Sequence, residues 1–162
     1  MSNTFYIADT HFCHRNIIKY CNRPFSSAQE MNQIMIDNWN SVVNKDDTVV
    51  HGGDFSLANK LVSIEIFDAL NGQKYLVRGN HDGTVRWAKS IGFIDVLPYW
   101  YVDRILVWHN PKLISDFMIS ENDIILYGHA HNNWKYELKN SYCISVECVG
   151  YTPRKIEEIL RA

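Results

Sequence analysis

The chain has 162 residues, a formal net charge of −2, 46% hydrophobic residues and 21% charged residues. This length and composition predict a single globular domain over 1–162 that is large enough to bury a substantial core. No basic excess indicates tight nucleic-acid binding, and no apolar run reaches the roughly 18 residues that a membrane-spanning helix needs.

Helix signals occur at four places along the chain. The clearest is a capping box at 27–30, followed by apolar residues at helical spacing, which predicts a helix packed against a sheet. The residues expected to face inward from this helix are Met31, Ile34, Met35, Trp39 and Val42. Three further helices are predicted over 59–70, 84–90 and 153–160. In the helix over 59–70, the expected inward residues are Leu61, Ile64, Phe67 and Leu70.

Short runs rich in Val, Ile and aromatic residues predict buried strands. Three such runs alternate with helices in the first half of the chain, and strand candidates dominate the second half. The late candidates cover 94–97, 99–103, 104–109, 123–128, 134–138 and 142–147. This order predicts an α/β or α+β fold with helices outside the sheet layers.

Five of the apolar runs end in a residue that can bind a metal. The segments that follow the runs are Asp9-Thr10-His11, Gly52-Gly53-Asp54, Gly79-Asn80-His81-Asp82, His109 and Gly128-His129-Ala130-His131. Ligands of open α/β sheets bind beyond the carboxyl ends of the strands, so we expect these side chains to meet at one edge of one sheet. Carboxylates, an amide and several imidazoles gathered at one place predict a site for two metal ions.

Each motif has a second interpretation when it is taken alone. An isolated Asp-x-His or Gly-Asp is common by chance, and His109 by default would be a core histidine. The His81-Asp82 pair does not fit a helical HD-type phosphohydrolase, because it follows a strand and a glycine. We expect Asp82 to fix the tautomer of the His81 ring, so that His81 can donate a proton or a hydrogen bond.

Other hydrolase signatures are missing from the chain. It has no HExxH motif, no Walker A loop and no GxSxG elbow. An amidohydrolase barrel carries its His-x-His near the start and needs roughly 250 residues. The chain is shorter than that, and its His-x-His lies near the end.

The motifs DxH, GD, GNH[DE], H and GHxH, in this order, resemble those of the calcineurin-like metallophosphoesterase superfamily. The resemblance covers nearly the whole chain. It is strongest for small, capless bacterial and phage members, which share a DTHFxHxNII-like start, here at 9–18. It implies a four-layer αββα sandwich, in which two mixed sheets lie face to face with helices outside.

The same resemblance implies roles for the site residues. It assigns the first metal site to Asp9, His11, Asp54 and His131. It assigns the second metal site to Asp54, Asn80, His109 and His129, with Asp54 as the bridge. His81 matches the histidine that orients phosphate or protonates the leaving group, so the predicted catalytic residues are His81 and Asp82.

Candidate substrate-binding residues are Asn80, His81, His14 and Arg78. The sequence does not decide whether His14 contacts the substrate phosphate or forms a hydrogen bond at the surface. For Arg78, the alternative to a phosphate contact is an ion pair beneath the loop.

The expected activity is hydrolysis of a phosphomonoester or phosphodiester by a water or hydroxide that bridges two divalent ions. We expect Mn first, with Fe, Zn, Ni, Co or Mg as alternatives. The expected substrate is a small phosphoester, a nucleotide included, with no membrane partner. Two other functions stay open, a non-catalytic metal-binding scaffold and a nuclease component. The nuclease would need a local basic cluster, for which the candidates are Arg15, Lys19, Arg23 and Arg78.

The four cysteines have neither CxxC spacing nor a secretory context, and the N-terminus has no leader-like pattern. We therefore expect reduced thiols in a cytoplasmic protein. Cys13 is expected to be a small, half-buried filler, although it lies between His11 and His14. The sequence leaves the oligomeric state and the physiological substrate open.

Overall fold

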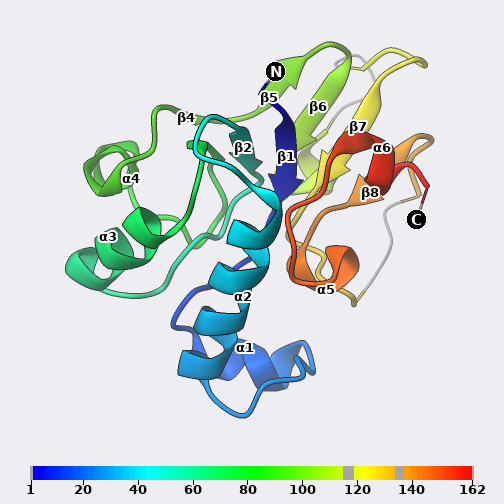
Figure 1. The fold of residues 1–162 in the computed structure, drawn as a ribbon. Helices are drawn as coiled ribbons and strands as arrows, with labels where there is room; N and C mark the ends of the chain where they lie inside the picture. The colour runs from blue at the N-terminus through cyan, green and yellow to red at the C-terminus, as the bar shows by residue number, and fades with distance from the viewer. Residues whose placement is uncertain (1, 115–118, 134–136, 162) are drawn as a thin grey trace.

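The computed structural model describes residues 2–114, 119–133 and 137–161, and these residues form two four-stranded sheets (Figure 1). The first sheet is parallel throughout and consists of β1 (Thr4–Ile7), β2 (Thr48–His51), β3 (Gln73–Val77) and β4 (Val96–Leu97). The second sheet consists of β5 (Trp100–Val102), β6 (Ile105–Trp108), β7 (Ile124–Tyr127) and β8 (Ser141–Cys143). In the second sheet only β5 runs antiparallel to its neighbour.

The helices are α1 (Arg15–Tyr20), α2 (Ala28–Val42), α3 (Lys60–Ala69), α4 (Val85–Ile91), α5 (Val146–Val149) and α6 (Ile156–Ile159), with a 3-10 turn η1 (Pro111–Leu113). Side-chain caps explain where three of them begin, because Ser27, Asn59 and Thr84 each accept a backbone N–H from the first turn. The expected capping box at 27–30 is half formed. Ser27 Oγ accepts the backbone N–H of Glu30, but the Glu30 carboxylate accepts the backbone N–H of Ser26 and not that of Ser27.

One apolar core joins the two sheets. Val50 of β2 and Val107 of β6 are fully buried in it, together with buried residues of α2, α3 and α4. Gly52, just after β2, allows the sheets to approach closely, because a Cβ there would lie 3.0 Å from both Ala8 Cβ and Ile144 Cδ1. The fold is the αββα sandwich that the family resemblance implies.

The second sheet is buried on its other face as well. Leu106 of β6 and Ile125 of β7 point away from the main core and pack with Ile114 in a second cluster. Because neighbouring residues of a strand face opposite sides, these strands are apolar along their whole length rather than alternating.

Several expected elements differ in the structure. The sequence did not predict α1. Leu61 is 73% exposed and Ile34 is 36% exposed, so the prediction that they face inward is wrong, and Ile66 takes the buried position in α3. The helix expected over 153–160 is shortened to α6, because Arg154 instead forms an antiparallel bridge with Tyr6.

The strand expected over 142–147 ends at Cys143, and α5 follows it after a short connection. The strand expected over 134–138 lies mostly outside the described residues, and 137 and 138 are not in a strand. Cys13, Cys21, Cys143 and Cys148 are free thiols. Within the described ranges, no helix has the length and apolar character needed to cross a membrane.

Candidate metal centre

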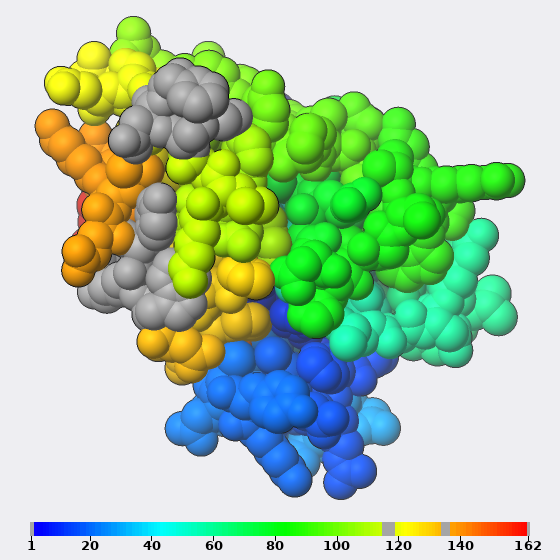
Figure 2. Space-filling view, turned by 180° about the vertical axis from the view of Figure 1, so that it is seen from behind, coloured from blue at the N-terminus to red at the C-terminus, as the bar shows by residue number. Residues whose placement is uncertain are grey.

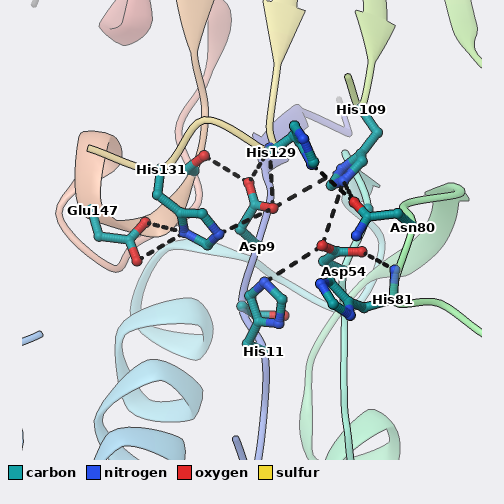
Figure 3. A network of polar contacts seen from close by, with 12 residues as sticks. Asp9, His11, Asp54, Asn80, His81, His109, His129, His131 and Glu147 are labelled. Atoms are coloured by element: carbon teal, nitrogen blue, oxygen red, sulfur yellow. Dashed lines mark hydrogen bonds and ion pairs between the residues drawn. The ribbon is translucent and has the colours of Figure 1, made fainter. Parts of the chain in front are cut away.

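The five predicted segments meet between the carboxyl ends of strands from both sheets (Figure 3). The ends of β1, β2 and β3 in the first sheet, and of β6 and β7 in the second, carry Asp9, His11, Asp54, Asn80, His109, His129 and His131. The expectation of one edge of one sheet is therefore wrong, because the site is shared by two sheets.

Backbone pairing between the sheets explains why the strand ends coincide. Ala8 forms a parallel bridge with Ser145, in which Ala8 N donates to Ile144 O and Val146 N donates to Ala8 O. This bridge joins the end of β1 to the segment after β8, and β8 is parallel to β7 and β6. Seven strands, β1 to β4 of the first sheet and β6 to β8 of the second, thus finish on the same side of the molecule.

Asn80 lies between two histidines of the second sheet. Its Oδ1 is 2.9 Å from both His109 Nε2 and His129 Nδ1, and His109 Nε2 is 3.4 Å from Asp54 Oδ2. His109 Nδ1 donates to Gly52 O at 2.8 Å, so that loss of the Nε2 proton would leave a lone pair on Nε2 facing Asn80 and Asp54. These four side chains are the ones that the resemblance assigns to the second metal site.

His11 is the clearest sign that the site fits a cation. The residue is 2% exposed, and neither ring nitrogen has a hydrogen-bond partner among the described residues. Its Nε2 lies 3.5 Å from Asp54 Oδ2, and its ring stacks on His131 with centroids 5.3 Å apart. An unpaired buried imidazole is costly, and a metal ion would take up its lone pair. Asp9, His11 and His131 also offer ligand atoms that all lie within 4.8 Å of one another.

Burial and mutual charges shift the pKa values of these groups strongly. Burial lowers the pKa of His11 to about 2, so its ring is neutral at neutral pH and can act as a ligand. Burial also raises the pKa of Asp9 to about 6, against the opposing charges of His109 and His131. Although burial opposes both shifts, the hydrogen bond and charges between His109 and Asp54 lower the pKa of Asp54 to about 2 and help raise that of His109 to about 9. A cation bound here would displace protons from such pairs.

The backbone at the site is strained. Five of the candidate ligands have left-handed φ values between 47° and 64°, namely Asp9, His11, Asp54, His129 and His131. Such conformations cost non-glycine residues roughly 1–3 kcal/mol each and persist where the surrounding structure holds them, often at functional sites. Gly79 leaves room for the Asp54 carboxylate, because a Cβ at Gly79 would overlap Asp54 Oδ1.

His81 lies at the open side of the site. Its backbone N–H donates to Asp54 Oδ1 at 2.8 Å, while its side chain is exposed and its ring is 5.5 Å from that of His11. On the face seen in Figure 2, the blue N-terminal segment, the green segment after β3 and the gold segment after β7 surround a hollow. The open position of His81 suits contact with a substrate.

Asp82 has a different role from the expected one. Its buried carboxylate accepts backbone N–H groups of Asp54, Phe55 and Gly79 at 2.7–2.9 Å, and within the described chain it does not bond to the His81 ring. It therefore positions the loop and the candidate bridging carboxylate of Asp54 rather than the His81 tautomer.

The two remaining candidates differ in their distance from the site. His14 directly precedes α1, its ring lies 5.6 Å from that of His11, and its Nδ1 is buried without a partner among the described residues. Arg78 is exposed, and it forms no ion pair with any described residue, so the expected pair beneath the loop is not formed.

The sequence did not identify three polar residues that support the site. Ser145 Oγ donates to Asp9 Oδ2 at 2.6 Å, Glu147 contacts His131, and Arg23 contacts Glu147. The strand expected over 142–147 concealed Ser145 and Glu147. In the structure both residues come after the end of β8, just as the other site residues come after the ends of their strands. A predicted strand that ended at Cys143 would have placed them among the candidate site residues.

Known proteins are similar to this chain over half of its length or more. Residues 3–145 match the model of the calcineurin-like phosphoesterase superfamily domain. An uncharacterized protein of Methanocaldococcus jannaschii is 37% identical over 169 residues, covering 99% of this chain and 91% of that protein. The Gene 66 protein of Mycobacterium phage L5 is 35% identical over 86 residues, covering 51% of this chain and 41% of that protein.

A solved structure covers the same length. The crystal structure of a protein of unknown function from Aquifex aeolicus superposes with a TM-score of 0.79 at 27% identity, covering 99% of each chain. The family match over most of the chain, the sandwich and the cluster of candidate metal ligands lead to one conclusion. The chain belongs to the calcineurin-like phosphoesterase superfamily.

Proposed function

We propose that the chain is a metal-dependent phosphoesterase that hydrolyses a small phosphomonoester or phosphodiester with two divalent ions. The observation that carries this proposal is the buried, unpaired imidazole of His11 beside Asp9, Asp54 and His131. The first ion would be held by Asp9, His11, Asp54 and His131, and the second by Asp54, Asn80, His109 and His129. Two such ions supply positive charge for the phosphoryl oxygens and a water nucleophile at neutral pH.

The exposed residues of the site would handle the substrate. His81 is fixed through its backbone to Asp54, and its free imidazole can give a proton to the leaving oxygen. The Asn80 amide directs its oxygen at two histidines, which leaves its N–H groups for a phosphoryl oxygen. His14, beside His11, is proposed as a further phosphate contact.

The donor set guides the choice of ion. Mixed imidazole and oxygen ligands favour Mn, with Fe, Zn, Ni, Co or Mg as alternatives. A nucleotide is included among the proposed substrates. A cytoplasmic location is also part of this proposal, and the four free thiols support it.

The nuclease alternative loses one of its expected cations. Arg23 is 4% exposed and its guanidinium bonds to Glu147 and to backbone carbonyls, so it is not available to a phosphate backbone. Arg15, Lys19 and Arg78 stay exposed. Binding to DNA that falls steeply with added salt would favour the nuclease over a small-molecule hydrolase.

The test compares the wild type with Asp54→Asn and His81→Ala on bis-p-nitrophenyl phosphate and p-nitrophenyl phosphate with added Mn²⁺. Loss of His81 should lower kcat by roughly 10²–10⁴-fold, the usual contribution of a general acid. Asp54→Asn should lower both activity and metal binding. Equal turnover by all three proteins would show that the site assignment is wrong. Bound metal without turnover on a broad phosphoester panel would favour the scaffold.

A further inference from the structure

His131 is held between two carboxylates from distant parts of the chain (Figure 3). Its Nδ1 lies 3.1 Å from both Glu147 oxygens, and its Nε2 lies 4.0 Å from Asp9 Oδ1. Because an ionised carboxylate can only accept, Glu147 keeps a proton on Nδ1. In the neutral ring, the lone pair is then on Nε2, the nitrogen that lies 4.0 Å from Asp9 Oδ1.

Glu147 is itself held by a buried cation. Arg23 Nε and Nη2 both lie 2.8 Å from Glu147 Oε1, and the two side chains are 0% and 3% exposed. The same guanidinium donates to Asp9 O at 2.7 Å and to Thr10 O at 2.9 Å. One side chain thus joins the strained backbone of Asp9 to the carboxylate that contacts His131.

We propose that Arg23 and Glu147 are positioning residues of the first metal site. Glu147 fixes the tautomer and orientation of the His131 ring, and Arg23 holds Glu147 and the Asp9 backbone in place. A carboxylate on the far nitrogen makes an imidazole a stronger ligand and excludes the tautomer that cannot bind. The inference rests on the metal centre of the proposed function but does not require hydrolysis.

Two other roles for Glu147 make different predictions. Cys21, His131 and Glu147 lie close enough to hold an ion of their own. The Arg23 guanidinium already occupies Glu147 Oε1, and its positive charge opposes a cation at that place. The second alternative is a buried ion pair that only holds the fold together.

The test measures zinc affinity of metal-free protein by calorimetry with a competing chelator. Glu147→Gln keeps the shape, but its amide can also donate to Nδ1, which permits the tautomer protonated on Nε2. We expect zinc binding at the first site to weaken about 10–100-fold. Glu157→Gln, the same change at an exposed position of α6, is the matched control and should bind zinc as the wild type does.

A second measurement reports the ring directly. In zinc-loaded wild type, long-range ¹⁵N spectra should show His131 with a protonated Nδ1 and a metal-bound Nε2. In Glu147→Gln this signature should be lost or averaged with the other tautomer. If Glu147→Gln does not fold, Glu147→Asp keeps the charge beside Arg23 but shortens the reach to His131, and it should weaken zinc binding in the same direction.

Three outcomes would overturn the proposal. In the first, a Glu147 variant has unchanged zinc affinity while its metal-free protein melts at a lower temperature. Glu147 would then serve only as an ion-pair partner that stabilises the fold. An equal loss of affinity in Cys21→Ser, which we expect to bind normally, would indicate a separate site at Cys21. Absence of zinc binding by the wild type would overturn the metal centre of the proposed function, and this inference with it.

Discussion

The Asp82 carboxylate accepts the backbone N–H of Asp54 at 2.8 Å and thereby ties the loop after β3 to the end of β2. The same carboxylate accepts the N–H groups of Gly79 and Phe55. The Asp54 carboxylate in turn accepts the N–H of His81. The two aspartates therefore lock two neighbouring loops together, and the position of the candidate bridging ligand depends on a residue that does not face the site.

Asp82→Asn should destabilise the protein. The two oxygens of the carboxylate accept three buried backbone N–H groups, and an amide has only one acceptor oxygen for them. The expected loss is about 1–3 kcal/mol, the range for leaving buried donors without partners. Urea unfolding of metal-free protein measures it. Asp37→Asn on the exposed face of α2 is the control and should shift stability by less than about 0.5 kcal/mol. Matching urea midpoints for Asp82→Asn and the wild type would contradict the view that the Asp82 carboxylate holds the two loops together.

Gly79→Ala should weaken metal binding more than it weakens the fold. A Cβ at Gly79 would overlap Asp54 Oδ1 and lie 2.6 Å from Asp54 N, so the carboxylate has to move. Calorimetric titration with Mn²⁺ or Zn²⁺ tests this. Gly83→Ala, whose Cβ would lie 3.2 Å from Trp87 Cδ2, is a control in the same loop. Retention of wild-type metal affinity by Gly79→Ala would argue that Asp54 is not a ligand.

Metal binding should raise thermal stability, because an ion that binds only the folded state stabilises it by mass action. At a free metal concentration 100 times Kd, the gain is about 2.7 kcal/mol. Calorimetric melting of wild type and Asp54→Asn, each with Mn²⁺ and with EDTA, measures the effect. The increase in Tm should appear in the wild type, disappear with EDTA, and be small in Asp54→Asn. The same increase in both proteins would place the ion elsewhere.

Lys74 should make stability depend on pH in the alkaline range. Burial lowers its pKa from 10.5 to about 8, and its ammonium donates to Leu70 O and Gly72 O beside the Phe67 ring. Between pH 8 and 10.5 the unfolded chain binds this proton more than the folded chain does, so the Lys74 contribution to stability rises with pH.

The comparison with Lys74→Met isolates this contribution from other groups that titrate in the same range. The free energy of unfolding, measured in urea at pH 7.5 and pH 10, should rise more for the wild type than for Lys74→Met. A pH dependence that is the same in both proteins would mean that Lys74 keeps its ordinary pKa in the fold.

Sequence pattern alone predicted the chemistry of the site and much of the layering. Short β-branched runs ending in Asp, Asn or His predicted both the strands and the positions of the candidate ligands, because a strand buried on both faces is a continuous apolar run bounded by polar residues. The capping residue Ser27 likewise predicted where α2 begins. These signals are local, so they can be read without knowing what packs against them.

Tertiary structure decided which segments meet and which residues support them. The Ala8–Ser145 bridge brings the ends of both sheets to one side, and no local pattern encodes that pairing. Leu61 is exposed although it fits the helical stripe, since burial depends on what the helix faces. Arg23 and Glu147 are 124 residues apart and meet only in the fold, where burial forces their charges to pair and places them behind His131.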